Sequence, residues 1–280
     1  MDKNELKRLK TIAANIRKNI VDTVYYANSG HPGGSLSCTD ILTVLYFKHM
    51  RIKEKEPKWV DRDRFVLSKG HCSPGLYSTL AQRGFFDIDD LKTFRKTQSN
   101  LEGHPNMNYV PGVDMSTGSL GQGISVACGM ALAGKIDKKD YRVFAILGDG
   151  EIEEGQVWEA LMSAAHYKLD NLTIFLDNNG LQIDGRIDEV MSPYPIVDKL
   201  KAFGQNVIEI DGNDIEEIDD AINQAKKVKG CPTVIVAKTI KGKGVSFMED
   251  QVGWHGKAPS LEQRDIAIKE LDKILSSLEE

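Results

Sequence analysis

Gly-Asp-Gly at residues 148–150 directly follows an apolar run at residues 141–147, and Asp-Asn-Asn at residues 177–179 directly follows a second apolar run at residues 172–176. The residues between the two runs include a stretch, 155–168, whose apolar side chains recur at helical spacing. The unit therefore reads as strand, helix, strand. A connection of this kind predicts two parallel strands joined by a right-handed crossover.

Polar side chains thus follow both strands at the point where each strand ends. If the strands are neighbours, Asp149 and Asn179 emerge at the same carboxyl edge, where open α/β sheets bind their ligands. A hard cation such as Mg²⁺ takes oxygen ligands from one or two side chains, phosphates and water. Gly150 would let the backbone approach a phosphate closely. The alternative is that both segments are ordinary turns, in which Gly, Asp and Asn are common for other reasons.

The same alternation of strands and helices extends over the chain and predicts an α/β fold. We expect a single domain over residues 1–280, with a mostly parallel sheet and helices on both faces. A helix over residues 124–133 is rich in small and apolar residues and is expected to be buried. The expected strands are 64–67, 141–147, 172–176, 206–210 and 232–237, and the expected helices are 6–27, Ser37 or Thr39 to Lys48, 124–133, 155–168, 215–226 and 261–278.

Composition excludes several classes of function. Charged residues make up 28% of the 280 residues and the net charge is only -5, which argues against a nucleic-acid surface or a basic membrane-binding face. The four cysteines form no C-x-x-C pair, so neither a zinc site nor a disulfide framework is expected. No apolar run has the length of a bilayer span and the first residues are polar. We therefore expect a soluble protein in a reducing cytoplasm.

Four of the six histidines adjoin a glycine, namely His31, His71, His104 and His255. Histidines beside glycines lie on turns, and turns at the strand ends of an α/β sheet line the ligand crevice. Imidazoles there could hydrogen-bond and move protons on a polyhydroxylated substrate. The alternatives are ordinary loop histidines or a three-histidine zinc site, although none has the i, i+4 spacing of a helical metal motif. His49 and His166 lie in helical stretches and are expected to be surface or core residues.

Two glycine patterns resemble nucleotide-binding motifs without matching them. Residues 129–135 match most of a P-loop, but Ile136 stands where a Mg²⁺-binding Ser or Thr is required and a helix precedes the stretch. Gly118, Gly121 and Gly123 lack the G-x-G-x-x-G spacing and the preceding strand of a dinucleotide site. Neither pattern therefore predicts a nucleotide site.

Taken in order, the glycine and histidine motifs resemble the diphosphate-binding half of transketolase, a thiamine diphosphate enzyme. The resemblance covers nearly the whole chain, and the ordered set is specific where any one motif is weak. Ser119 departs from the family pattern, since many members carry proline there, and only local backbone geometry is affected. The motifs are SGHPGG, DRFVLSKGH, EGHP, TGSLGQG, GDGEIEEG with its partner DNN, KTIKGKG and WHGKAP.

The resemblance implies a role for each matching residue. Asp149, Asn179 and the backbone carbonyl of Leu181 would hold Mg²⁺, or Ca²⁺ or Mn²⁺ in its place. Glu154 and Glu159 would join a carboxylate network that links the two active sites of a dimer, although helix-start carboxylates also serve as caps. The implied cofactor-binding residues are His71, Gly118, Leu120, Gly150, Glu154, Asn179, Lys241 and His255, and the implied catalytic residues are His31, His71, His104, Glu154 and His255.

The resemblance also implies what the chain lacks. Family members usually continue into a domain that binds the aminopyrimidine ring, and we expect that domain on a separate partner chain, in a dimer of heterodimers. The implied reaction moves a two-carbon ketol unit from a ketose phosphate to an aldose phosphate, as in the pentose phosphate pathway. The alternatives are a component of another thiamine diphosphate enzyme, with a different sugar phosphate or a 2-oxo acid as donor, and a non-catalytic cofactor-binding subunit.

Overall fold

A parallel sheet forms the centre of the molecule, which a computed structural model describes over residues 1–279. The five strands have the order β1-β2-β3-β5-β4, and every neighbouring pair is parallel. Four of the five are almost continuously buried, as expected for strands covered on both faces. The α/β fold and all the expected strands are confirmed. The strands are β1 (Arg64–Leu67), β2 (Val143–Gly148), β3 (Leu172–Asn178), β4 (Asn206–Asp211) and β5 (Thr233–Lys238).

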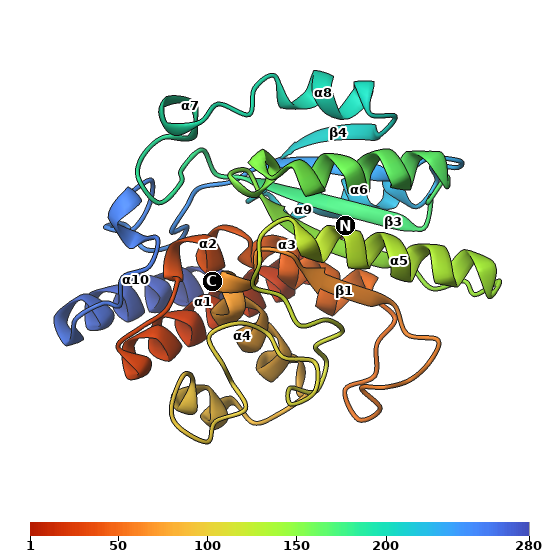
Figure 1. The fold of residues 1–280 in the computed structure, drawn as a ribbon. Helices are drawn as coiled ribbons and strands as arrows, with labels where there is room; N and C mark the ends of the chain where they lie inside the picture. The colour runs from red at the N-terminus through yellow and green to blue at the C-terminus, as the bar shows by residue number, and fades with distance from the viewer. Residues whose placement is uncertain (280) are drawn as a thin grey trace.

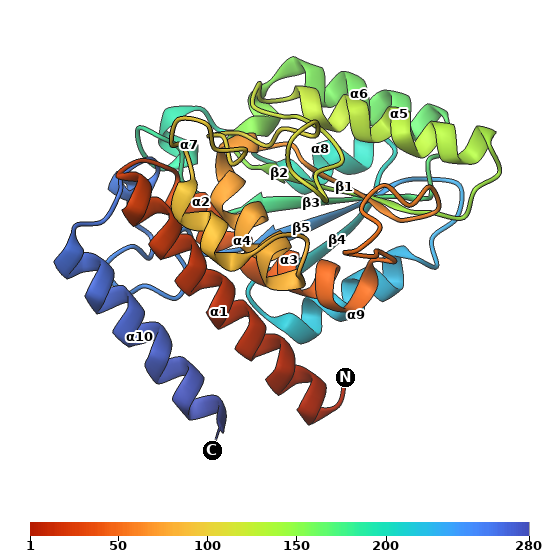
Figure 2. The same ribbon diagram turned by 90° about the horizontal axis from the view of Figure 1, so that it is seen from below.

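Helices cover both faces of this sheet, as Figure 2 shows from its edge. Each face has its own apolar core, one built from Phe144 and Phe175 and the other from Val143 and Ile174, because alternate side chains of a strand point to opposite faces. One layer contains α1 (Lys3–Ala27), α3 (Thr39–Val44), α4 (Ser73–Arg83) and α9 (Ile215–Ala225), and the other contains α5 (Gln122–Ile136), α6 (Gly155–His166) and α8 (Ile196–Ala202).

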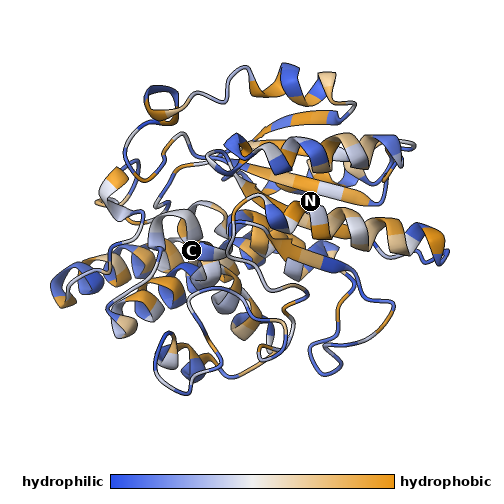
Figure 3. Cartoon of the chain, in the orientation of Figure 1, coloured by the Kyte–Doolittle hydropathy of each residue, from blue (hydrophilic) through white to orange (hydrophobic). Residues whose placement is uncertain are grey.

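The last helix, α10 (Leu261–Glu279), packs along α1 and away from the sheet (Figure 1). A separate apolar cluster that includes Ile16, Ile20 and Leu271 holds the two helices together. Shorter elements lie in the connections and carry much of the polar sequence, which appears blue in Figure 3. They are α7 (Ile187–Val190) and the 3-10 helices at Gly70–Cys72, Ile88–Thr93, Glu151–Glu153 and Val252–Trp254.

The helix expected to start at Ser37 or Thr39 starts earlier and is divided. It begins as α2 (Pro32–Ser37), continues as α3 after a break at Cys38, and ends in a π-helical turn at Leu45–His49. Pro32 occupies the first helical position, where its fixed φ favours the helix and its missing N–H costs nothing. Gly33 and Gly34 therefore lie within a helix, and His31, which was expected on a turn, directly precedes it.

The expected burial of the helix at residues 124–133 is correct for only one side of α5. Gly123 and Ala127 face the sheet and are buried, whereas Gly129 and Ala133 on the opposite side are exposed. Residues 129–135 lie within this helix, so they form no phosphate-binding loop. Of the helices within residues 1–279, none combines the length and the apolar composition needed to cross a bilayer.

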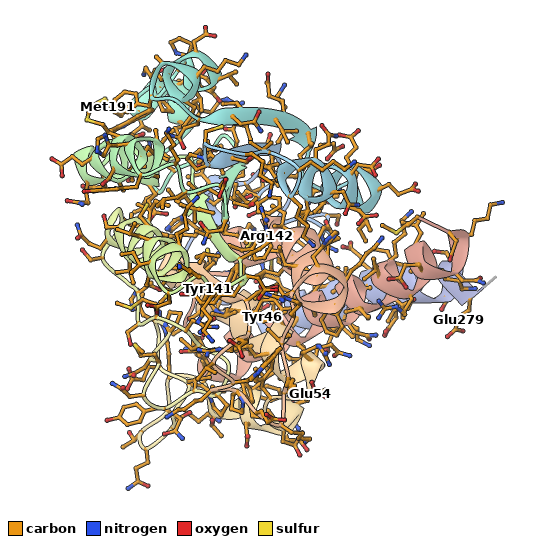
Figure 4. All side chains as sticks on the ribbon, turned by 90° about the vertical axis from the view of Figure 1, so that its right-hand side faces the viewer. Tyr46, Glu54, Tyr141, Arg142, Met191 and Glu279 are labelled. Carbon is orange, nitrogen blue, oxygen red and sulfur yellow. The ribbon has the colours of Figure 1, made fainter. Side chains whose placement is uncertain are left out.

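The amino-terminal ends of the strands are closed by polar contacts. Tyr141 and Arg142 lie together where the chain enters β2 (Figure 4). The Arg142 guanidinium donates to the backbone carbonyls of Asp170 and, at 3.5 Å, Ala225. This edge is thereby filled by the chain itself, and the functional residues described next lie at the opposite, carboxyl edge.

Candidate functional site

The two polar segments after β2 and β3 meet at the carboxyl edge of the sheet. Gly148 is paired with Asp177 across the neighbouring strands, which places the following loops side by side. The Gly180 N–H donates to Asp149 Oδ2 at 2.6 Å, and the Gly150 N–H donates to Oδ1 at 3.0 Å. The parallel crossover predicted from the sequence is confirmed, and it brings the Asp149 carboxylate against the Asn179–Leu181 segment.

A cavity of about 270 Å³ lies beside these loops. Residues from widely separated parts of the chain form its wall, because the carboxyl ends of β1, β2, β3 and β5 and the turn before α2 all open at this edge. Most residues singled out from the sequence line it together. The lining residues include His31, His71, Gly118, Leu120, Asp149, Gly150, Asn179, Leu181, Lys241 and His255.

Asp149 is a carboxylate that forms no ion pair within residues 1–279. Its side chain is buried, and burial together with the nearby charge of Asp177 raises its pKa to about 7. Asn179 accepts the Leu181 N–H through Oδ1 at 3.2 Å while its amide nitrogen donates to Asp177. Carboxylate, amide and carbonyl oxygens are the ligand set of a hard cation, so these residues fit Mg²⁺ completed by phosphate and water.

Among residues 1–279, the histidines at this place do not form a metal-binding group. Residues 1–279 contain no group of three or more His, Cys, Asp and Glu side chains that could hold a metal ion. The rings of His31, His71 and His255 are close, with centroid separations of 5.2–5.3 Å, but they form no such group. The structure therefore gives no support to the three-histidine zinc alternative.

The three clustered histidines are neutral at physiological pH. Burial is the main cause, and it lowers the pKa of His31 and His71 to about 4 and that of His255 to about 3. The charge of Lys241 adds to the effect at all three. His31 Nδ1 is buried without a hydrogen-bond partner in the described structure. The rings can thus donate or accept hydrogen bonds to a ligand without adding positive charge.

Lys241 brings a buried ammonium to the same wall. It donates to the carbonyls of Leu181 at 3.1 Å and Gln182 at 3.3 Å, and it lies 3.1 Å from His255 Nδ1. Burial lowers its pKa, and the carboxylate of Asp149 opposes this decrease. A diphosphate in the cavity would therefore meet this cation and could supply oxygen ligands to a metal held by Asp149 and Asn179.

Sequence reasoning missed the fully buried ion pair of Lys69 and Asp177 beneath the cavity. Lys69 donates to Asp177 and to the Gly34 carbonyl, and Asp177 also accepts the hydroxyls of Ser37 and Thr239. Burial is the largest single cause and opposes ionisation of Asp177, but the charge of Lys69 and the hydrogen bonds from Lys69, Ser37 and Thr239 together hold the Asp177 pKa below its usual value. The sequence does contain a signal for this ion pair. A charged residue lies at the end of each of two buried strands, and buried charges must be paired.

Glu151 is a second functional residue that the sequence interpretation missed. Its buried carboxylate accepts hydrogen bonds from the Ser68 hydroxyl at 2.5 Å, the Gly121 N–H at 3.0 Å and the Gly148 N–H at 3.1 Å. Burial raises its pKa, and these donors oppose the increase. One side chain therefore joins the ends of β1 and β2 to the loop that carries Gly118 and Leu120.

Three expected site residues lie outside the cavity wall. The His104 ring packs on Gly118, so closely that a Cβ there would lie 3.2 Å from it. Glu154 lines an adjoining surface hollow with Trp158 and the exposed Met191, which projects from the edge of the molecule in Figure 4. Glu159 is exposed on α6. The roles expected for both glutamates need a second chain and remain predictions.

A family of known proteins matches this arrangement. The model of the transketolase thiamine diphosphate-binding domain matches residues 9–273. The chain belongs to this family. The matched residues include all those that line the cavity, from His31 to His255.

Similar proteins of two lengths occur. One of the subunits of an apulose-4-phosphate transketolase from Phocaeicola vulgatus is 44% identical over 94% of this chain and 93% of its own length. A 6-deoxy-6-sulfo-D-fructose transketolase subunit from a Clostridium species is 45% identical over 92% of this chain and 94% of its own length. The transketolase of Campylobacter jejuni superimposes with a TM-score of 0.86 at 32% identity, over all of this chain but only 48% of its own. The chain thus spans less than half of such longer transketolases and nearly all of the subunits.

Proposed function

We propose that this chain is the diphosphate- and metal-binding subunit of a two-subunit transketolase. The observation that carries the proposal is the convergence of Asp149, Asn179, the Leu181 carbonyl and three neutral histidines around one cavity at the carboxyl edge of the sheet. The end-to-end match to two transketolase subunits supports it. The proposed reaction moves a two-carbon ketol unit from a ketose phosphate to an aldose phosphate, and we expect this in the cytoplasm.

The residues of the cavity have distinct proposed roles. Asp149, Asn179 and the Leu181 carbonyl would hold Mg²⁺, with Gly150 and Lys241 against the diphosphate. When bound, thiamine diphosphate supplies the electron sink for breaking a carbon–carbon bond beside a ketose carbonyl. His31 and His255 would hydrogen-bond sugar hydroxyls as neutral rings, which can both donate and accept protons. His71, Gly118 and Leu120 would shape the wall around the cofactor.

We further propose a partner chain that supplies the rest of each active site. The two similar subunits are named for apulose 4-phosphate and 6-deoxy-6-sulfo-D-fructose, so the donor of this chain is proposed to be a ketose with an anionic group. The expected assembly is a dimer of heterodimers in which Glu154 and Glu159 face another chain. The exposure of both glutamates and of the outer side of α5 supports this arrangement.

The test is a calorimetric titration with thiamine diphosphate and Mg²⁺, first of the chain alone and then with a candidate second subunit. We expect metal-dependent binding that Asp149→Ala abolishes, with ketol transfer from xylulose 5-phosphate to ribose 5-phosphate only in the mixture. Asp188→Ala is the matched control, because it removes an exposed carboxylate from a nearby segment and should bind normally. Absence of cofactor binding even in the mixture would refute the proposal, and binding without turnover would favour a non-catalytic subunit.

A further inference from the structure

Arg95 differs from every other arginine in residues 1–279 in what it contacts. Seven of the other nine have a carboxylate within 4 Å, and the remaining two, Arg64 and Arg142, donate to backbone carbonyls. Arg95 has neither kind of side-chain partner and makes one hydrogen bond, from Nη1 to the Ser29 hydroxyl at 2.6 Å. Most of its five N–H donors are therefore free.

Arg95 is exposed, and its guanidinium packs against two neighbouring groups. It lies over the ring of the buried Phe94, with its carbon 5.4 Å from the ring centroid. It also packs against Gly103, where a Cβ would lie only 2.8 Å from Arg95 Nε. The backbone of Arg95 is left-handed, at φ 58°, and its N–H donates to the Leu101 carbonyl. A non-glycine residue in this conformation is strained, and strain of this kind occurs often at ligand contacts.

Arg95 lies close in the fold to the segments that carry His31 and His104. Ser29 lies two residues before His31, and Gly103 directly precedes His104, so the guanidinium lies between the two segments that carry these rings. Burial is the main cause of the lowered pKa of both histidines, and the charge of Arg95 contributes to each. An exposed cation with unused donors thus lies between the segments of two histidines that the resemblance implies to be catalytic.

We infer that Arg95 binds the phosphate or sulfonate group of the sugar substrate. This inference rests on the proposed function and extends it, because it names a residue of this chain that would contact the anionic group of the sugar. A planar guanidinium with paired free donors matches the geometry of a tetrahedral oxyanion. Arg95 is then a specificity-determining residue that favours donors with an anionic group over neutral ketoses.

The experiment compares donors in the complex of this chain with its second subunit. The donors are xylulose 5-phosphate and xylulose, with glycolaldehyde as the common acceptor. In Arg95→Gln we expect KM for the phosphorylated donor to rise about 10-fold or more, while KM for xylulose stays within about twofold, since a charge-assisted hydrogen bond contributes on this order. Arg95→Lys should recover part of the loss, because it keeps the charge without the bidentate geometry.

Lys96→Gln is the matched control, since it removes the same charge from the adjacent exposed residue and should leave both KM values unchanged. An equal change for both donors in Arg95→Gln would overturn the inference and leave Arg95 as a support for the backbone around His31 and His104. A donor that carries a sulfonate in place of the phosphate shows which oxyanion is preferred: a larger effect of Arg95→Gln on either one supports the inference.

A second measurement keeps this inference separate from the proposed function. Inorganic phosphate is titrated into the isolated chain while the ring signals of His31 and His104 are followed by NMR. Saturable shifts that disappear in Arg95→Gln and persist in Lys96→Gln support the anion site even if the complex has no ketol transfer activity. Identical titrations of the wild type and Arg95→Gln would refute it, and inactivity towards both donors would refute only the proposed function.

Discussion

Burial of the Asp149 carboxylate destabilises the ligand-free fold, and a bound cation would remove this destabilisation. The folded chain buries this carboxylate beside Asp177, and the result is a pKa of about 7 in place of 3.8. The ligand-free fold therefore favours the protonated form, whereas a bound cation favours the carboxylate. Asp149 is thus a binding-site residue whose position lowers the stability of the ligand-free fold.

The pH dependence of stability tests that argument. Because the folded pKa exceeds the unfolded one, the stabilising contribution of Asp149 is complete below pH 3.8 and is lost as the pH rises through about 7. Relative to Asp149→Ala, the free energy of unfolding of the ligand-free chain should fall by about 1.4 kcal/mol per pH unit between pH 5 and 7. Urea unfolding of both proteins at three pH values measures this. A difference that does not vary with pH would contradict the prediction.

The buried pair of Lys69 and Asp177 gives a second prediction. Lys69→Met leaves the Asp177 carboxylate buried without its cation, and we expect a loss of about 3–5 kcal/mol in the free energy of unfolding. The control is Lys53→Met, which breaks the exposed pair with Glu56 and should cost less than about 1 kcal/mol. Urea unfolding compares the two variants, and equal effects would show that burial of the pair has no energetic role.

At the scale of elements, α5 uses glycine for close approach on one side only. A Cβ on Gly123 would lie 2.7 Å from the Ser68 hydroxyl and 2.8 Å from its Cα, so the helix can reach the end of β1 only if residue 123 has no side chain. A Cβ on Gly129 would meet nothing within 4 Å. A Cβ on Gly134 would lie 2.9 Å from the Tyr141 ring, so the same helix contains two glycines required by packing and one, Gly129, that is not.

Alanine substitutions at Gly129 and Gly123 should change the free energy of unfolding in opposite directions. Gly129→Ala is expected to stabilise the isolated chain by about 0.5–1 kcal/mol, because alanine loses less backbone entropy in a helix. Gly123→Ala should destabilise it by about 1–3 kcal/mol, since the helix must move away from β1. Thermal unfolding of the two variants provides the measurement. Destabilisation by both would imply that Gly129 is also packed against something in solution.

The whole molecule has an apolar outer surface on α5 and α6. We name it the α5–α6 surface and define it by Gly129, Met130, Ala133 and Met162, of which Met162 is 60% exposed. Most of α5 is orange or pale in Figure 3. Apolar surfaces of this kind mark interfaces more often than free surface. The surface agrees with the proposal that chains associate.

Ala133→Glu tests the association at this scale. The side chain is exposed on a helix, so the fold should be nearly unaffected, but a buried charge at an interface should weaken the assembly. Sedimentation of the complex with the second subunit should show a shift from heterotetramer towards heterodimer. Lys138→Glu, at the exposed turn after α5, is the control for added negative charge. An unchanged assembly in Ala133→Glu would place the interface elsewhere.

The sequence by itself determined the parallel sheet, the order of its elements and most of the residues that line the cavity. It could do so because buried strands need continuous apolar runs, and because Gly, Asp, Asn and His after such runs mark the ligand-binding edge. Helix boundaries were less certain: Pro32 begins a helix in a stretch that reads locally as a glycine loop. The local sequence pattern does not show whether such a stretch forms a helix or a loop.

Only the tertiary structure decided which of these residues act together. The pairing of Lys69 with Asp177, the three contacts of Glu151 and the place of Arg95 between the segments of His31 and His104 join residues far apart in the chain. Folding also raises the pKa of Asp149 and lowers those of the histidines, because desolvation and neighbouring charges arise only in the tertiary structure. A sequence specifies residue types and their spacing along the chain, whereas burial and the distances between residues are properties of the fold.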